Sequence, residues 1–506
     1  LQTGDNNRFL RLWYEVEYGR IGYGCRNAEE ALNSKKKWFP YNKGGEFRKW
    51  YGNQEYVVNW ENDGEEIKNF KDHKGKLRSR PQNSRYYFRE CVAWSAISSS
   101  DFSVRYFGNG FIFSNAGMAI FEHKAPLFYI AGYLNSKAAR YFISIISNTL
   151  NFNQSDIEKL PTTFDRKIES CCRDIFNRNI YISKTDWDSF ETSWDFKKHP
   201  FLTYRNGAKN LAESFANWAD HAERQFNQLK ANEEELNRIF IELYGLQDEL
   251  TPEVPDEEVT VRKADRERDA KSFLSYCVGL IMGRYSLDVD GLAYAGGEWD
   301  ASKYRTIIPD QDGIVPLTDV AYFEDDIITW LNRILIAIYG EEELANNLQW
   351  LAESLGGIRS DESAEDRIRR YFFDEFYKDH CRIYQKRPIY WMADSGPKKG
   401  MRALFYLHRY TPHTLGTLRF RYVQELQVKL RQEEKYIEQR LADPSISAGE
   451  RRALTKKLST LRDRQEELVR FDQKLAELAN RQIALDLDDG VVVNYEKLKD
   501  VLAKIR

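Results

Sequence analysis

The chain has 506 residues, of which 42% are hydrophobic, 30% are charged and 14% are aromatic. This composition is typical of globular domains, and the length predicts two to four of them. The formal net charge of −3 excludes a chain that is basic throughout. Any surface for a polyanion must therefore arise from an uneven distribution of charge along the sequence.

No apolar run approaches the roughly 20 residues that a membrane-spanning helix needs, and no signal peptide is recognisable. The six cysteines lack metal-ligand spacing, so we expect no metal site and interpret them as reduced thiols of a cytoplasmic protein. Residue 1 is leucine rather than methionine. From this we expect the chain to be the later part of a longer polypeptide.

Residues 1–165 are predicted to form a twisted, mainly antiparallel β domain. Positive charge concentrates in residues 35–89, which hold 14 basic and 7 acidic side chains, whereas the rest of the chain sums to −10. Within this region the stretch 38–53 interleaves aromatic residues with Lys43, Arg48 and Lys49. Aromatic anchors with outward-facing cations would suit contact with DNA phosphates. The alternative is a β-hairpin with a solvated basic edge.

Further candidate DNA contacts follow this stretch. Residues 74–85 are polar, rich in arginine and interrupted by glycine and proline, which predicts a mobile loop or one ordered by a ligand. Apolar runs on both sides of an Asn-Gly pair predict a β-hairpin over 102–113. Asn and Gln side chains can bind the edge of adenine, although they also cap turns. The candidate contacts are Arg78, Arg80 and Arg85 in the first segment, Arg105 and Asn109 in the second, and Gln154 farther along the chain.

After residue 165 the chain is predicted to be largely helical. Apolar residues recur at helical spacing over 210–244, and the glutamates 233–235 are expected on a solvated face of that helix. Farther along, a small β-hairpin is predicted over 386–407. It presents Lys398, Lys399 and Arg402, either as a second phosphate contact or as a solvated loop tip.

Leucines close to a 3.5-residue period predict an antiparallel helical hairpin over 421–484. The predicted fold class is therefore α+β, with a β domain followed by a mostly α-helical region and a long helical hairpin. We expect a β domain at 1–165 and a helical spacer with an acidic linker at 166–260. A mostly helical domain is expected at 261–420, and a helical hairpin with a tail helix at 421–506.

Several long motifs resemble known DNA-modifying proteins. LNSKAARYF and TLNFNQSDIEKLP are similar to the target recognition domains of type I specificity subunits and type IIG restriction-modification enzymes. TGDNNRFLRLW, PYNKGGEFRKWYGN and RYFGNGFIFSNAGMAIF resemble the PglX family, the adenine-specific DNA methyltransferases of BREX phage-defence systems. Similarity to that family continues in the segments 229–254, 275–292, 376–423 and 485–505.

The resemblance implies sequence-specific recognition of double-stranded DNA as the specificity part of an adenine-N6 methyltransferase. The catalytic motifs of such enzymes, a glycine-rich S-adenosylmethionine loop and an Asn/Asp-Pro-Pro-aromatic motif, are missing, since no Pro-Pro pair occurs in the sequence. We therefore expect no catalytic or cofactor-binding residue in these 506 residues. S-adenosylmethionine and the methyltransferase domain that binds it are expected upstream.

Other partners follow from the same resemblance. Besides duplex DNA and the upstream domain, they include other BREX subunits in a bacterial cytoplasm. On physical grounds alone, an acidic, DNA-mimicking inhibitor protein could occupy the groove that binds DNA. The alternative function is a scaffold that docks other defence-system subunits, with DNA contact secondary. An independent nuclease is disfavoured, because no paired carboxylates with a lysine stand at a strand end.

Overall fold

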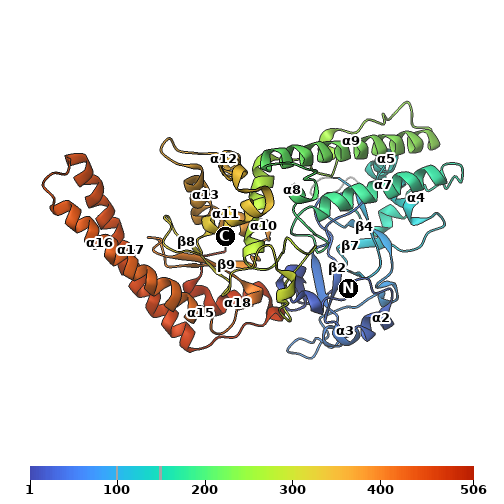
Figure 1. Ribbon diagram of the computed structural model, residues 1–506. Coiled ribbons are helices and arrows are strands. Elements are labelled where there is room, and N and C mark those ends of the chain that lie inside the picture. Colours follow the sequence, from blue (N-terminus) through green and yellow to red (C-terminus); the bar gives the residue numbers. More distant parts are fainter. Residues whose placement is uncertain (98–100, 147–150, 506) are drawn as a thin grey trace. The chain divides into compact units, whose positions relative to one another are not determined.

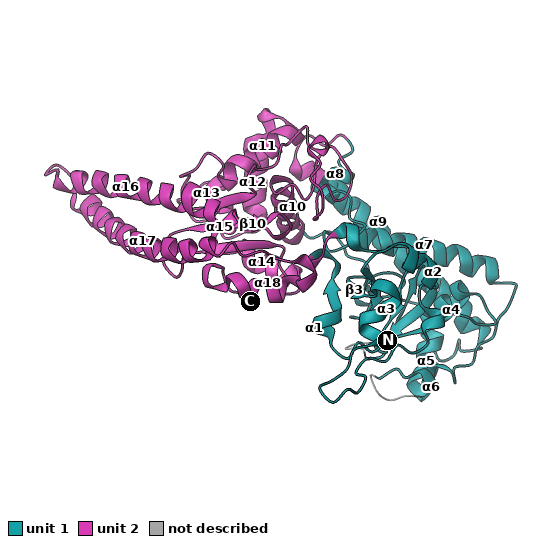
Figure 2. Ribbon diagram, turned by 90° about the horizontal axis from the view of Figure 1, so that it is seen from below, with its two compact units in different colours: residues 1–14, 18–206, 215–265 teal, residues 15–17, 207–214, 266–506 magenta. Residues whose placement is uncertain are grey.

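The computed structural model describes residues 1–97, 101–146 and 151–505, so the start of the motif at 149–161 lies outside the described residues. The chain forms two compact units. Unit 1 comprises residues 1–14, 18–206 and 215–265, and unit 2 comprises 15–17, 207–214 and 266–506 (Figure 2). Small, mainly antiparallel sheets precede a helix-rich region, which confirms the predicted α+β class.

The first sheet of unit 1 has the order β1-β3-β2-β6. Its strands are β1 (Leu10–Leu12), β3 (Tyr56–Asn59), β2 (Trp38–Asn42) and β6 (Ile112–Phe113). All pairs are antiparallel except β2 with β6, where Tyr41 lies opposite Ile112. Every residue of β2 is buried, so this strand is central to the sheet and its core.

A second sheet has the order β5-β4-β7 and is antiparallel throughout. It consists of β4 (Cys91–Ser95), β5 (Val104–Phe107) and β7 (Gly117–Ile120). The hairpin predicted over 102–113 is wrong, because β5 joins this sheet whereas β6 pairs with β2 of the other. The turn between them, with φ +104° at Gly110, passes the chain from one sheet to the other.

Helices complete unit 1. The short ones are α1 (Asn6–Phe9), α2 (Ala28–Asn33), α3 (Glu61–Lys68), α4 (Leu127–Leu134), α5 (Lys137–Ile146), α6 (Gln154–Ile157) and α8 (Pro200–Thr203). The long ones are α7 (Glu169–Asp188) and α9 (Leu211–Leu243), and α9 confirms the helix predicted over 210–244. Residues of α4, α7 and α9 pack with the second sheet in one hydrophobic core.

Unit 2 is built around a three-stranded antiparallel sheet of order β8-β10-β9. Its strands are β8 (Ile314–Leu317), β10 (Arg402–Tyr406) and β9 (Tyr390–Asp394), of which β9 and β10 form the predicted hairpin. The helices that accompany the sheet are α10 (Arg266–Ile281), α11 (Ile327–Tyr339), α12 (Leu344–Leu355), α13 (Ala364–Asp374), α14 (Phe376–Ile383), α15 (Thr414–Thr417) and α18 (Gly490–Leu498).

The predicted helical hairpin is confirmed as α16 (Gln424–Ala442) and α17 (Ala448–Asn480), which lie side by side (Figure 1). A π-helix, Leu418–Val423, leads into α16. Buried leucines such as Leu430 on α16 and Leu468 on α17 join the core of unit 2. Among the described residues, no helix combines the length and apolar character that crossing a bilayer requires.

Candidate nucleic-acid interface

The aromatic and cationic stretch 38–53 points much of its charge into unit 1. Lys49 is buried, and its Nζ lies 2.7 Å from Oε2 of Glu233 on α9. The indole Nε1 of Trp50 donates to the other carboxylate oxygen, also at 2.7 Å. The expectation that Lys49 faces outward is therefore wrong, as is the expectation of a solvated face for Glu233. Each charge is buried because the other compensates it.

Arg48 also pairs with a buried carboxylate inside unit 1. Its guanidinium donates to Asp186 on α7 at 2.5 Å, and Arg262 also donates to this carboxylate. Burial favours the neutral carboxyl, but Arg262 and Arg48 together hold the pKa of Asp186 below its usual value. The Arg48 side chain is only 12% exposed. Arg48 therefore links the stretch to α7 and to the segment around Arg262.

Arg105 is fully buried, so it is not a surface contact near a hairpin tip. Its guanidinium donates to the hydroxyl of Ser95 at 3.0 Å and to the backbone carbonyl of Arg48 at 3.2 Å. Burial, together with the nearby Arg48, lowers the pKa of Arg105 to about 10. Because a phosphate cannot reach this position, we remove Arg48, Lys49 and Arg105 from the candidate interface.

A different segment presents exposed cations. Residues 70–85, which we call the basic arm, fold back on themselves through an antiparallel bridge between Lys71 and Leu77. A second antiparallel bridge, between Arg80 and Gln2, attaches the arm to the N-terminal segment. Asp72 accepts the backbone N–H groups of Lys74 and Lys76 and so closes the turn. A φ of +78° at Gly75 completes this turn without steric cost.

The side chains of the basic arm alternate between interior and solvent. Ser79 is buried and donates its hydroxyl to the carbonyl of Ile67, whereas its neighbours Arg78 and Arg80 are exposed. In an extended segment, residues two apart face the same side, so the two arginines share one face. Within the part of the chain that the structure describes, no carboxylate forms an ion pair with Lys71, Lys74, Lys76, Arg78, Arg80 or Arg85.

Arg8 is a neighbour of the basic arm that the sequence analysis missed. The guanidinium carbons of Arg8 and Arg78 lie 5.1 Å and 5.7 Å from the ring centroid of Phe70. Glu66 partly compensates Arg8 through an ion pair of 2.8 Å. No sequence pattern indicates this arrangement, because Arg8 lies outside the basic region 35–89 and contacts Phe70, 62 residues later, through the fold.

The remaining candidates are dispersed. Lys43 is half-buried with its Nζ 4.3 Å above the ring of Tyr56. Arg85 is exposed and lies over the Tyr86 ring at 4.8 Å, within the basic arm. Asn109 and Gln154 are exposed, but their amides donate to the carbonyl of Phe88 and to Glu158, respectively. Only Arg78, Arg80 and Arg85 are brought together in one segment.

In unit 2 the cations of the β9–β10 hairpin are neutralised. Lys398 pairs with Asp463 at 2.6 Å, Lys399 pairs with Asp374, and Arg402 pairs with Asp394 at 3.0 Å. The predicted second phosphate contact at this hairpin therefore lacks free charge. This pairing contrasts with the basic arm, where the positive charges have no such compensation.

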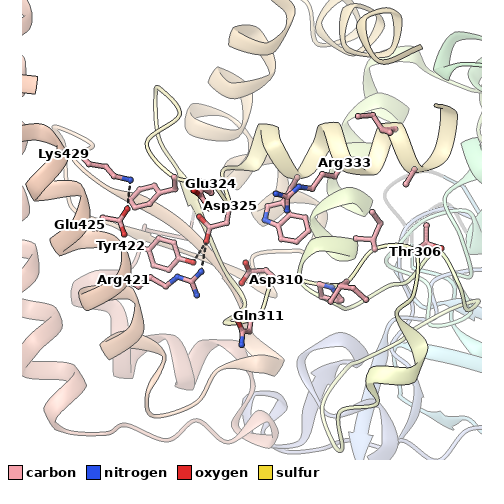
Figure 3. A pocket seen from close by; sticks show the side chains of 17 residues that line it. Thr306, Asp310, Gln311, Glu324, Asp325, Arg333, Arg421, Tyr422, Glu425 and Lys429 are labelled. Carbon is pink, nitrogen blue, oxygen red and sulfur yellow. Dashed lines mark hydrogen bonds and ion pairs between the residues drawn. The ribbon is translucent and has the colours of Figure 1, made fainter. Parts of the chain in front are cut away.

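Unit 2 also contains a cavity of about 980 Å³ whose lining carries both signs of charge (Figure 3). Arg421 and Tyr422 point toward Asp325, and the Tyr422 hydroxyl donates to this carboxylate at 2.7 Å. Nearby, burial and the adjacent Asp312 raise the pKa of Asp310 to about 7. The paired charges make this cavity unsuited to a polyanion. No group of side chains in the described ranges could hold a metal ion.

The fold and the exposed cations describe an α+β protein with a basic surface segment. Comparison with known proteins shows which proteins it is similar to. No family model matches the chain. Its sequence is homologous to a part of adenine-specific methyltransferases. It is 44% identical to "Adenine-specific methyltransferase PglX" of Lacticaseibacillus casei (strain Zhang) over 98% of this chain. It is 36% identical to "Adenine-specific methyltransferase BrxX" of Escherichia coli O9:H4 (strain HS) over 100% of this chain.

The chain spans 41% and 42% of the lengths of these two relatives. The resemblance to PglX that the sequence motifs indicated is thereby confirmed. The matched regions cover 98% and 100% of this chain and therefore span both compact units.

Proposed function

We propose that the chain recognises double-stranded DNA as the specificity part of an S-adenosylmethionine-dependent adenine-N6 methyltransferase of a BREX-type phage-defence system. Its relatives are named adenine-specific methyltransferases, which supports DNA as the partner. The cofactor and the reacting adenine would be held by a methyltransferase domain outside these 506 residues. We place the protein in the bacterial cytoplasm, where host DNA and other defence-system subunits are available.

The uncompensated cations of the basic arm are the observation that carries this proposal. Lysine and arginine side chains without carboxylate partners can release counterions from the DNA backbone when they bind it, which supplies most of non-specific affinity. We assign Lys71, Lys74, Lys76 and Arg78 to phosphates. We assign Arg80 and Arg85 to the base edges, because arginine can bind guanine bidentately in the major groove.

A charge reversal in the basic arm tests the proposal. The variant K74E/K76E removes two phosphate contacts, so the slope of log affinity against log salt should fall by about 2. Fluorescence anisotropy of a labelled duplex at several salt concentrations measures this slope. The control K398E/K399E changes the net charge equally but alters lysines that are already paired. If both variants give the same slope as the unmodified chain, the basic arm does not bind DNA.

A further inference from the structure

A groove at the tip of the helical hairpin has a lining that differs from every other cation-bearing surface described above. It has a volume of about 920 Å³ and runs from the turn between α16 and α17 along the first turns of α17. Its lining contains three cations, three hydroxyl groups and no acidic side chain. The lining residues, which define the tip groove, are Pro444, Ile446, Ala448, Arg451, Arg452, Thr455, Lys456, Ser459 and Thr460.

The acidic side chains of the hairpin are engaged elsewhere. Glu433 and Glu434 on α16 pair with Lys457 and Arg462 of α17 at 2.7 Å each. Glu450, at the start of α17, pairs with Arg440 at 2.8 Å. These ion pairs connect the two helices and direct the paired carboxylates away from the lining of the tip groove.

Arg452 and Lys456 are left on the outer face. Both are exposed, and neither has a carboxylate partner among the residues that the structure describes. Helical residues four apart lie on the same face, about 6 Å apart along the axis, and Ser459 extends that face by another turn. The face is turned away from α16 because the leucines between these positions, such as Leu458, pack against the core of unit 2.

Arg451 fixes one side of the tip groove. Its guanidinium donates to the carbonyl of Leu441 at 2.7 Å and to that of Asp443 at 3.4 Å. Both bonds go to backbone carbonyls. Hydrogen bonds from Ser445, together with the charges of Arg440 and Arg451, lower the pKa of the nearby Asp443, whose carboxylate is paired with Arg440. The turn between the helices is thereby braced by the same side chain that lines the groove.

We propose that the tip groove binds the phosphodiester backbone of double-stranded DNA, as a contact separate from the basic arm. Arginine, lysine, serine and threonine are side chains that bind phosphate oxygens, and here they line one groove whose lining contains no acidic side chain. Charge complementarity selects a polyanion. The hydroxyls of Thr455 and Thr460 donate to the carbonyls of Arg451 and Lys456. Ser459 is therefore the lining residue whose hydroxyl can donate to a phosphate oxygen. The inference does not depend on the basic arm, since the two sites belong to different units.

The decisive variant is R452E/K456E in the full chain, measured by anisotropy with a labelled duplex of random sequence. Removal of two phosphate contacts should lower the slope of log affinity against log salt by about 2. The matched control is R431E/K435E, which makes the same two reversals at the same spacing on exposed positions of α16 outside the groove, where neither side chain has a carboxylate partner among the described residues. This control should leave the slope unchanged. Equal slopes for the two variants would overturn the inference.

An acidic protein is the competing occupant, so polyglutamate serves as a second probe. Loss of polyglutamate binding in R452E/K456E with unchanged duplex binding would also overturn the proposal. The basic-arm variant K74E/K76E separates the two proposals. A normal slope for K74E/K76E with a reduced slope for R452E/K456E would reject the basic arm alone, and the opposite pattern would reject the tip groove alone.

Discussion

Lys49 and Glu233 form a buried ion pair, with Nζ 2.7 Å from Oε2, that joins the loop after β2 to the middle of α9. The two side chains are 2% and 4% exposed. Taking either charge out of water is unfavourable, so each residue is tolerated only because the other is present. The pair therefore attaches the loop after β2 to α9, and neither charge is available to DNA.

Lys49→Met should lower the free energy of unfolding of unit 1 by about 3–5 kcal/mol, because it leaves the Glu233 carboxylate buried without a cation. The double variant K49M/E233Q should recover most of this loss. Its glutamine removes the charge but keeps a carbonyl oxygen for Trp50 Nε1. Urea unfolding followed by tryptophan fluorescence measures both. A single variant as stable as the unmodified chain would refute this role for the pair.

Asp310 should make the stability of unit 2 depend on pH. Burial and Asp312 raise its pKa to about 7, so the folded state binds a proton that the unfolded state releases near pH 4. The stabilisation from this proton is complete below about pH 4 and is lost as the pH rises through 7. Asp310→Asn should therefore flatten the pH dependence and stabilise unit 2 at pH 8 by roughly 1–3 kcal/mol.

In the unmodified protein the backbone N–H of Gly313 donates to Oδ1 of Asp310 at 2.7 Å. The amide oxygen of the Asp310→Asn variant can accept the same hydrogen bond. Its matched control is Asp361→Asn, at an exposed position of the same unit. Thermal unfolding at pH 5 and pH 8 measures the difference. If Asp310→Asn and Asp361→Asn change the melting temperature equally at both pH values, Asp310 does not carry a raised pKa.

Gly110 should be essential for the passage of the chain between the two sheets of unit 1. A Cβ at this position would lie 2.8 Å from the backbone nitrogen of Gly24, and φ is +104°. Gly110→Ala should therefore cost about 2–4 kcal/mol of stability. Gly108→Ala, where no atom lies within 4 Å of the added Cβ, is the control. Chemical unfolding that gives similar midpoints for the two variants would contradict this expectation.

Arg80 should affect sequence preference more than overall affinity. Selection from a library of random duplexes should show that Arg80→Ala loses discrimination at one base pair, worth about 1–3 kcal/mol. Lys74→Ala, in the same arm, should weaken binding to all duplexes alike, because we assign Lys74 to a phosphate and phosphate contacts carry no sequence information. A uniform loss of affinity in Arg80→Ala would assign that residue to the backbone instead.

Local pattern determined much of this protein. The helical spacing of apolar residues predicted α9, and the leucine period predicted the α16–α17 hairpin. The polar composition of 74–85 predicted a loop, mobile or ordered by a ligand, and most of its residues are exposed. These features depend on residues close together in the sequence. The long motifs likewise indicated the PglX resemblance without any knowledge of the fold.

Tertiary structure alone decided which charges are available. In sequence, Lys49 in its basic stretch and Lys74 in the basic arm look alike, yet one faces Glu233, 184 residues away, and the other faces solvent. Long-range packing likewise places Glu233 in the interior rather than in solvent. It also pairs β6 with β2 of one sheet and β5 with β4 of the other. A charge is compensated by whatever the fold brings within a few ångströms, and that neighbour is set by long-range packing rather than by position along the chain.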